Sequence, residues 1–554
     1  MDQTASRLTG FFESYYRLRP VNATFTGVHA HDHRLPDWSP EGLEAAADDM
    51  RGVRAALNEP EPSDDGLRDV AARDRELARA FLDIQLAEDR SAHFVRGNPS
   101  LAAGEALFGV ISLMTRPFAP AAERAEAAID RLRAIPRFLT GATRSIKSVP
   151  DEWRTRTLKD CDGADRLLDG GIAKWTAIEN IDAPAKQALT DAARDARRAF
   201  HDFRHWLIQD VTPAPADHYS CGGELFDLLL RRGHSCLRSR PDLAKDASDR
   251  LEDACATLNE AARRAAPGGW PEVQARLADT HPSRERYLAA FQETWDACRA
   301  GAAEHDLVSW PEYPIRYVPI PVQTRDAAPF LYYLFYRSPA PFDRLPTHDY
   351  VVTPIEGDMP ADEQRARLRA ANASVIKLNH VVHHGAIGHH VQNFHAYAGP
   401  SEIGRVAAVD CASRIGMFAG GTMAEGWACY ATDLMDEVGF LTADESLAQQ
   451  HTRARLLARA VADIGLHSGT LTFDAACALY REKVGMSPDA ARGEACKNSM
   501  FPATAVMYWL GTEGIHQLRA ERRRVEGRDF SLRRFHDRLL GFGSIPVPLI
   551  ARIW

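Results

Sequence analysis

A succession of amphipathic helical patterns, from about residue 40 to residue 305, constrains the fold more than any other feature of this sequence. Apolar residues recur there at three- and four-residue spacing in segments rich in Ala, Leu, Arg and Glu, which are good helix formers. No repeat of fixed length accompanies the pattern, so a solenoid is not expected. The sequence therefore predicts a mainly α protein. The helices expected in this region span residues 41–57, 68–91, 121–135, 151–175, 183–209 and 240–265.

Pro and Gly residues punctuate these helices. Pro136 and the pair Gly170-Gly171 are two such positions. A further helix is expected over residues 5–20, where Pro20 would end it, and residues 20–27 are expected to form a turn. The loop that follows contains three histidines, which we do not expect to be metal ligands because no motif further along supplies them with a partner. They are His29, His31 and His33.

The composition changes near residue 307 and becomes β-branched, aromatic and rich in Pro. Residues 310–322, 330–336 and 350–353 favour strands, which the prolines would confine to edges. We therefore expect a small β insertion around 310–355, lying over a deep cleft. Helices are expected to resume at residue 362 and to continue almost to the end, where an apolar tail should pack back on the body. The expected segments are 405–438, 447–466, 472–482, 487–499, 502–524 and 530–540, and the tail is 545–550.

The chain has 554 residues, which is too many for one compact core, since single cores stop growing at about 250–300 residues. We expect one continuous, two-lobed and peptidase-like body. Its parts would be an N-terminal helical region over 1–305, an extended segment over 306–360 and a C-terminal helical region over 361–554.

Charge and cysteine usage exclude several classes of protein. The net charge of −9 argues against a nucleic-acid partner, and the basic clusters, such as Arg522-Arg523-Arg524, are short and lie in sequence of mixed charge. No apolar run reaches the roughly 18–20 residues that a membrane span needs, and the N-terminus lacks the pattern of a signal peptide. The nine cysteines include no Cys-x-x-Cys pair, which favours reduced thiols. We therefore expect a cytoplasmic enzyme that acts on a small molecule or a peptide, and the sequence is silent on its oligomeric state.

The chemistry is concentrated in one stretch, because six of the 21 histidines lie within residues 380–395. Imidazole is the commonest metal ligand in proteins and a usual proton carrier near neutral pH. Glu425 follows His390 by 35 residues and could add a carboxylate ligand. The stretch indicates a metal site made of two histidines and one glutamate. The alternative is a histidine-rich interior helix that holds no metal.

Helical geometry restricts which histidines can share one ion. His380 and His384 lie four residues apart, so on a straight helix they share a face. His383 and His389 lie on different faces and far apart along the axis, and they converge only if the helix is broken between them. Gly385 and Gly388 would permit such a break, since glycine relaxes the backbone. Both pairings are possible from the sequence alone.

Two motifs carry a resemblance to a known family. His383-x5-His389-His390-Val391-Gln392 and Glu425-Gly426-Trp427-Ala428-x-Tyr430-Ala431 resemble the signature of the bacterial domain-of-unknown-function family eight-eight-five. Further similarity extends over nearly the whole chain. Its elements are Pro20-x2-Ala23-Thr24-x2-Gly27, Arg459-x3-Asp463-x-Gly465-x-His467, Tyr508-x2-Gly511-x7-Arg519 and Phe535-His536-Asp537-x2-Leu540-Gly541-x-Gly543-Ser544.

That family is itself similar to helical zinc metallopeptidases that use His-Glu-x-x-His and a downstream glutamate. The resemblance implies that the metal ligands are His383, His389 and Glu425. It implies that His467 and Tyr508 could hydrogen-bond a developing oxyanion, although both could equally be bonded core residues. The remaining candidates are more peripheral. They are His390 and His380 as neighbouring groups or alternative ligands, Asp463 as the group that orients a histidine, and Arg519 as a substrate-binding residue.

The sequence departs from the family pattern where relatives carry the glutamate that acts as general base in peptidases, because His384 stands there. His384 could act as the base itself, since an unperturbed imidazole has a pKa of about 6.5. It could instead be a further metal ligand. The first expectation is a zinc-dependent hydrolase of small amides or peptides. The alternatives are a lyase or oxidase that holds zinc, iron, manganese, nickel or copper, and a non-catalytic binding protein.

Overall fold

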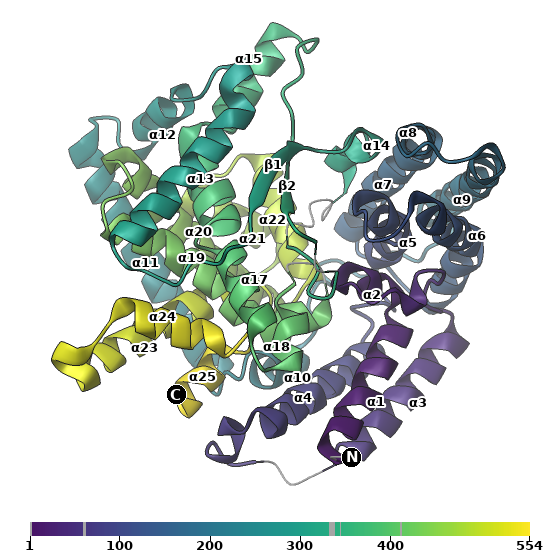
Figure 1. The fold of residues 1–554 in the computed structure, drawn as a ribbon, viewed down its shortest axis with the longest axis horizontal. Coiled ribbons are helices and arrows are strands. Elements are labelled where there is room, and N and C mark those ends of the chain that lie inside the picture. Colours follow the sequence, from purple (N-terminus) through teal and green to yellow (C-terminus); the bar gives the residue numbers. More distant parts are fainter. Residues whose placement is uncertain (1–2, 59–61, 332–337, 344, 410–412) are drawn as a thin grey trace.

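A computed structural model describes residues 3–58, 62–331, 338–343, 345–409 and 413–554. The fold is mainly helical, as predicted, and its described residues contain two short strands. In Figure 1 the helices α5 to α9 form one group at the side of the molecule, and α17 to α22 form another at its centre. None of the helices within the described ranges has the length and apolar character needed to cross a membrane.

The N-terminal half is an array of helices whose bounds largely follow the predicted ones. Two short π-helical segments interrupt the array, η3 (Leu167–Gly171) and η4 (Leu229–Gly233). The helices are α1 (Gln3–Leu18), α2 (Pro20–Thr26), α3 (Pro40–Ala56), α4 (Val70–Arg90), α5 (Pro99–Thr115), α6 (Ala121–Ser145), α7 (Asp151–Arg166), α8 (Ile172–Ile178), α9 (Ala183–Gln209), α10 (Gly223–Leu228), α11 (Arg240–Ala265), α12 (Trp270–Asp279) and α13 (Tyr287–Glu304).

Two predictions in this half were wrong, for residues 20–27 and at Pro136. Residues 20–27 do not form a turn, because Pro20 occupies the first position of α2, where the missing N–H costs nothing. Pro136 lies inside α6, which continues to Ser145 with Phe138, Leu139 and Ala142 buried. Packing of this face outweighs the hydrogen bond that the proline removes. The pair Gly170-Gly171 ends the π segment η3, and the chain enters α8 without leaving the helical conformation.

A two-stranded parallel sheet lies in the predicted β insertion. Strand β1 (Ile315–Pro319) pairs with β2 (His348–Val352), with Ile315 opposite His348 and Pro319 opposite Val352. The third expected strand, over 330–336, falls mostly on residues outside the described part of the chain. Its first residue, Phe330, ends a short 3₁₀ helix (Ala328–Phe330) that follows α14 (Val322–Arg325).

The C-terminal half is helical to the end of the chain. Residues 405–438 were predicted as one helix, but α18 ends at Ala407 and a new helical run begins near Gly416. The apolar tail packs back on the body as predicted, in the form of a helix. The elements are α15 (Ala361–Ala370), α16 (Ala373–Val375), the π-helical η7 (Ile376–Gly385), α17 (His389–Ala398), α18 (Glu402–Ala407), the π-helical η8 (Gly416–Gly420), α19 (Gly421–Glu437), α20 (Ala443–Ser468), α21 (Phe473–Val484), α22 (Pro488–Met500), α23 (Val506–Glu526), α24 (Leu532–Gly541) and α25 (Val547–Ile553).

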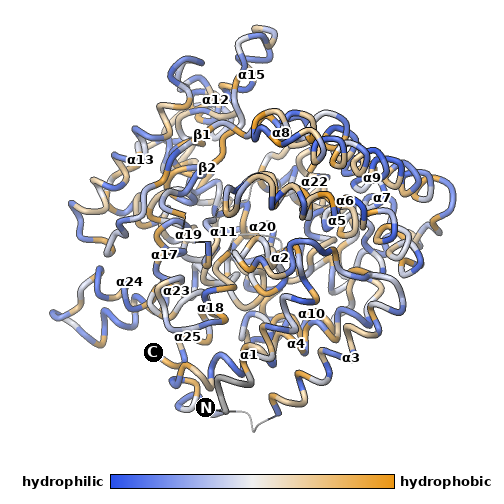
Figure 2. The backbone as a smooth tube through the Cα atoms, turned by 45° about the vertical axis from the view of Figure 1, so that its right-hand side comes forward, coloured by the Kyte–Doolittle hydropathy of each residue, from blue (hydrophilic) through white to orange (hydrophobic). Residues whose placement is uncertain are grey.

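The two halves share their hydrophobic cores. One continuous cluster joins Phe11 of α1 and Phe81 of α4 to Val381 of η7 and Trp427 of α19. The outer helices are amphipathic, and Figure 2 shows hydrophilic and hydrophobic residues alternating along α3 and α9. The histidine-rich segment therefore lies inside a core that both ends of the chain build.

Candidate metal centre

The helix that carries the histidines is broken between His383 and His389. The π-helical η7 ends at Gly385, and α17 begins at His389. A Cβ atom on Gly388 would lie 1.9 Å from the His383 carbonyl oxygen, and one on Gly385 would lie 2.1 Å from the Tyr317 hydroxyl. Only glycine fits such close approaches. The break brings the His383 and His389 rings to a centroid distance of 4.9 Å.

Two buried tryptophans hold the turn between these helices. The indole Nε1 of Trp295 donates to the Gly385 carbonyl at 2.7 Å, and that of Trp427 donates to the Ile387 carbonyl at 2.9 Å. Both carbonyls lie where the helical ladder is interrupted, so they need partners from elsewhere. The two indoles thus stabilise the path of the chain that sets the spacing of the histidines.

Three donor atoms converge at this break. Glu425 Oε2 lies 3.4 Å from His383 Nε2 and 3.5 Å from His389 Nε2. Two ligands that each lie about 2.0–2.1 Å from a tetrahedral zinc ion are roughly 3.3–3.4 Å apart. The separations in this structure therefore fit the predicted ligand set, and the donors are the nitrogen and oxygen types that zinc binds.

The charge of Glu425 is compatible with that role. Its side chain is only 13% exposed, and burial alone would raise its pKa. The neighbouring His383 and His389 outweigh burial and hold the pKa of Glu425 well below its usual range. A carboxylate that stays ionised inside the protein needs a cation, and a metal ion would supply that charge.

His384 lies beside the same cluster. One ligand atom from each of His383, His384 and His389 lies within 4.8 Å of the others. The Nδ1–H of His384 donates to the Asn379 carbonyl at 2.6 Å, so in the neutral ring Nε2 carries the lone pair. This arrangement is typical of ligating histidines, whose second nitrogen is fixed by a carbonyl or carboxylate. It also suits a general base, because both roles use Nε2.

The alternative pairing of His380 with His384 does not occur. The π-helical hydrogen bonding of η7 changes the spacing of its faces relative to an α-helix. His380 Nδ1 instead lies 3.0 Å from the Tyr350 hydroxyl of β2. His390 also points away from the cluster, with Nε2 donating to the Tyr313 carbonyl at 2.8 Å, and burial lowers its pKa to about 4. Both histidines fasten the β insertion to the helices below it.

His467 and Asp463 lie outside the cluster, contrary to their predicted roles. His467 is fully buried, accepts from the Cys221 N–H at 3.2 Å and donates to the Asn498 carbonyl at 3.0 Å. Asp463 accepts main-chain N–H groups of Ala503, Ala505 and Val506, all between 3.0 and 3.1 Å. The carboxylate therefore holds the turn before α23, and its Oδ1 lies 3.7 Å from Nε2 of His467, outside the cluster.

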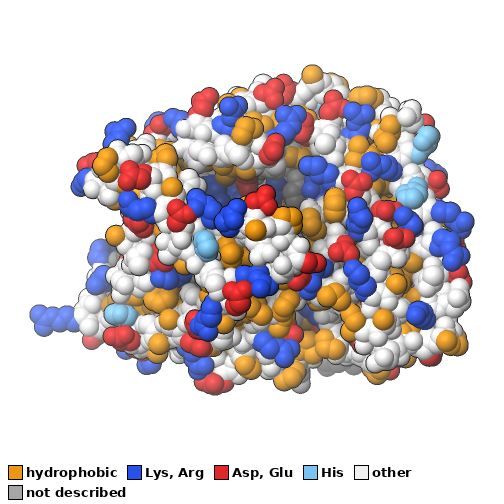
Figure 3. Space-filling view, turned by 90° about the horizontal axis from the view of Figure 1, so that it is seen from above, with side chains coloured by type: hydrophobic (Ala, Val, Ile, Leu, Met, Phe, Trp, Pro, Cys, Tyr) orange, Lys and Arg blue, Asp and Glu red, His pale blue; other side chains and the backbone are white. Residues whose placement is uncertain are grey.

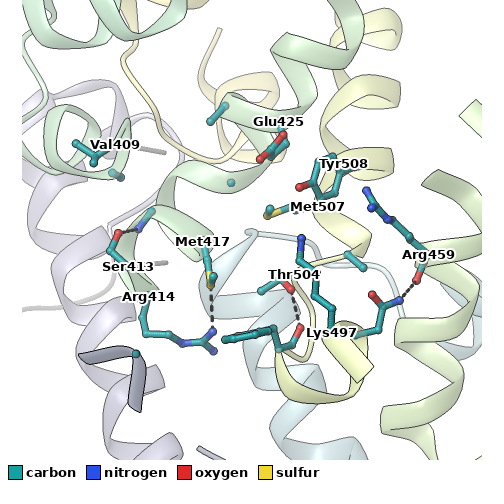
Figure 4. Close-up of a pocket in the computed structure, with 18 of the residues that line it drawn as sticks. Val409, Ser413, Arg414, Met417, Glu425, Arg459, Lys497, Thr504, Met507 and Tyr508 are labelled. Carbon is teal, nitrogen blue, oxygen red and sulfur yellow. Dashed lines mark hydrogen bonds between the residues drawn. The ribbon is translucent and has the colours of Figure 1, made fainter. Parts of the chain in front are cut away.

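Tyr508 and Arg519, both on α23, differ in position. Figure 4 shows Tyr508 next to Glu425 on the wall of a cavity, where its hydroxyl could reach a bound molecule. Arg519 makes a two-point ion pair with Glu437 at 3.1 and 2.8 Å, and it also contacts the Tyr430 hydroxyl at 3.1 Å. It does not line that cavity, so its predicted contact with substrate is not supported.

The cavity has a volume of about 1820 Å³. His383, His384, Glu425 and Tyr508 line it, whereas His389 is not among the lining residues. Figure 3 shows one face of the molecule hollowed near its centre, with basic and acidic side chains around the opening. A space of this size accommodates a small organic molecule or a short peptide.

Three residues at the centre were not identified from the sequence. Cys429 Sγ lies 4.0 Å from His383 Nδ1, one helical turn after Glu425 on α19. Its i+4 spacing from Glu425 was a signal that could have placed it there. Trp295 and Asn379 make their contacts through main-chain carbonyls, and no sequence pattern marks such partners.

Comparison with known proteins gives a family and a fold. A family model described as "Bacterial protein of unknown function (DUF885)" matches residues 20–553. A solved structure of a proposed lipoprotein of unknown function from Shewanella oneidensis has a TM-score of 0.75, with 20% identity over 99% of each chain. A proposed lipoprotein from Colwellia psychrerythraea has a TM-score of 0.78, with 16% identity over 100% of this chain and 98% of the other. No curated protein was found to match the sequence.

Proposed function

The chain belongs to the bacterial DUF885 family, whose function is unknown, and from that premise we propose that it is a zinc-dependent hydrolase of small amides or peptides. One observation carries the proposal. Two imidazole nitrogens lie 3.4 and 3.5 Å from one buried carboxylate oxygen, and this carboxylate lines a large cavity. Two histidines and one carboxylate with an open position form a common type of catalytic zinc site.

In this proposal His383, His389 and Glu425 hold the ion. When bound, zinc supplies a Lewis acid that polarises a carbonyl and lowers the pKa of water at the open position. His384 accepts a proton at Nε2, and the Asn379 carbonyl fixes the ring in the required tautomer. Tyr508 donates a hydrogen bond toward the substrate oxygen on which negative charge develops.

A second function follows if His384 binds the metal instead. Its contact with Asn379 is the type of outer contact that ligating histidines make. Three histidines and a carboxylate suit iron, manganese, nickel or copper as well as zinc. The protein would then be a metal-dependent lyase or oxidase.

Elemental analysis of untagged protein, purified without chelators, tests the proposal together with a panel of peptides and amides. We expect close to one zinc per chain and hydrolysis that stops when a chelator is added. A stoichiometric redox-active metal would favour the lyase or oxidase. No metal after reconstitution would overturn both and leave a non-catalytic binding protein.

The His384→Glu variant separates the two roles of His384. If His384 is a substitute base, a glutamate at this position should raise the hydrolytic rate and leave the zinc content unchanged. If His384 is a ligand, the same change should abolish the native activity and alter which metal co-purifies. His390→Asn is a suitable control, because His390 bonds to the Tyr313 carbonyl and faces away from the cluster.

The place of action is also a matter for experiment. The sequence led us to expect a cytoplasmic protein, whereas the two similar structures belong to proteins described as proposed lipoproteins. We propose a cytoplasmic location. Fractionation of cells that produce the chain from its natural gene tests it, and recovery in the membrane fraction would overturn it.

A further inference from the structure

Basic side chains of two helices line the cavity next to the candidate metal centre. Arg455 and Arg459 lie four residues apart on α20 and therefore on one face of that helix. Lys497 of α22 also lines the cavity. In Figure 4 the Lys497 side chain extends toward Met507 and Tyr508, close to Glu425.

The guanidinium of Arg459 is already neutralised. Its Nε and Nη2 atoms donate to the two carboxylate oxygens of Glu494, each at 2.6 Å. This is the two-point geometry that arginine forms with a carboxylate. The same guanidinium lies 5.7 Å from the centre of the Tyr508 ring. Glu494 is also an electrostatic neighbour of Arg455, so two guanidinium groups share this one carboxylate.

Arg455 differs from Arg459 in its partners. Among the residues that the structure describes, it forms no ion pair, and its Nε is buried without a hydrogen-bond partner. Its electrostatic neighbours include Arg459, Cys429 and Tyr508. Burial and then the like charge of Arg459 lower the pKa of Arg455. Because arginine stays protonated in proteins, this group is a cation whose neighbouring carboxylate, Glu494, is hydrogen-bonded to Arg459.

Three acidic residues elsewhere on the cavity wall form ion pairs with other groups. Asp433 contacts Arg453 and His516, Glu437 contacts Arg519, and Glu513 contacts Arg250. Cys429, a neighbour of Arg455, lies 4.0 Å from Nδ1 of His383. The excess positive charge of Arg455 and Arg459 over Glu494 is therefore located on the wall that adjoins the metal centre.

We propose that Arg455 binds an anionic group of the substrate, so that the enzyme acts on amides or peptides that carry a carboxylate close to the bond to be broken. The guanidinium presents paired N–H donors that match a carboxylate, and phosphate offers similar chemistry. The position of the anion relative to the reaction rests on the proposed function, whereas its binding by Arg455 does not.

Calorimetric titration tests the binding without turnover. The probes are an N-acetylated D-dipeptide with a free C-terminal carboxylate and the same dipeptide with a C-terminal amide, titrated into the protein as purified. We expect wild type to bind the acid about tenfold to 100-fold more tightly than the amide, and Arg455→Met to remove that preference. Arg453→Met is the matched control, because Arg453 also lines the cavity but pairs with Asp433 at 2.6 Å.

Each result decides one point. Equal binding of acid and amide by wild type overturns the inference, even if no arginine variant folds. An equal loss of both ligands in Arg455→Met, or an unchanged preference for the acid, also overturns it. Wild type could instead bind inorganic phosphate tightly and the acid weakly, with phosphate binding lost in Arg455→Met. That result would identify the ligand of Arg455 as a phosphate and overturn the proposal of a carboxylate. Selective binding of the acid by a protein that hydrolyses nothing would support Arg455 while the proposed function fails.

Discussion

Two groups of histidines in the interior of this protein differ in what their ring nitrogens contact. His234, His467 and His536 are fully buried, and each donates to a main-chain carbonyl at 2.6 to 3.0 Å. Burial lowers the pKa of each to about 4, so these rings are neutral. His383 and His389 instead face the carboxylate of Glu425.

The partner of the ring nitrogens distinguishes structural histidines from candidate metal ligands better than the burial of the ring does. His389 is 4% exposed, which is nearly as buried as the first group. In the first group a main-chain carbonyl takes one ring N–H, and no described contact brings two of these rings to one carboxylate. A buried carboxylate shared by two imidazoles concentrates charge and lone pairs at one point, as a metal site requires.

Removing a ring from each group should give the sharpest contrast. We expect His383→Ala and His389→Ala each to reduce bound zinc from close to one equivalent to near zero, because a three-ligand site loses one ligand. His467→Asn should retain the metal in full, since its ring hydrogen-bonds to main-chain groups of Cys221 and Asn498, and its ion-pair partner Asp463, at 3.7 Å, also lies outside the cluster. Elemental analysis after dialysis measures both. Loss of zinc in His467→Asn would contradict the proposed difference between the two groups of histidines.

Replacing a glycine of the turn should weaken zinc binding less than the loss of a ligand does, but still strongly. The Gly388→Ala variant would place a Cβ atom 1.9 Å from the His383 carbonyl oxygen, so the turn must shift. We expect zinc affinity to fall about 100-fold, which corresponds to roughly 3 kcal/mol of misfit. Gly493→Ala is the control, because a Cβ there meets nothing within 4 Å. Unchanged affinity in Gly388→Ala would show that the turn does not set the spacing of the ligands.

The smallest expected effect is on the stability of the protein at acidic pH. His467 has a pKa of about 4 when folded, against about 6.5 in the unfolded chain, so the unfolded state binds more protons between these values. Its contribution to stability is fully present above about pH 6.5 and is lost as the pH falls toward 4. We expect wild type to lose about 2 kcal/mol more than His467→Asn between pH 8 and pH 5. Urea unfolding at both pH values measures the free energy of unfolding. Identical losses of stability in wild type and His467→Asn would contradict a pKa of about 4 for His467 in the folded protein.

The sequence predicted the helical class and most helix bounds because periodic apolar faces report on packing directly. It also identified Gly385 and Gly388 as residues that would permit a break between His383 and His389, and the π-helical η7 ends at Gly385. It was wrong at Pro20 and Pro136, where a first-turn position and a buried helix face decide whether proline is tolerated.

The candidate site was less fully predictable. His383, His389 and Glu425 lie together as the resemblance implied, but His467 is tied to main-chain groups 31 and 246 residues away in the sequence. No periodicity or motif distinguishes a histidine that faces a carboxylate from one that faces a carbonyl. That distinction depends on tertiary contacts, and so does the isolation of Arg455.

The indoles of Trp295 and Trp427 give the centre a built-in optical signal. They are two of only ten tryptophans, and each bonds to the turn that joins His383 to His389. Because polypeptide contacts hold this turn, we expect the fold around it to persist whether or not the proposed ion is bound. Emission from these two rings would then change each time the centre is emptied or filled, and paramagnetic ions such as copper would quench it.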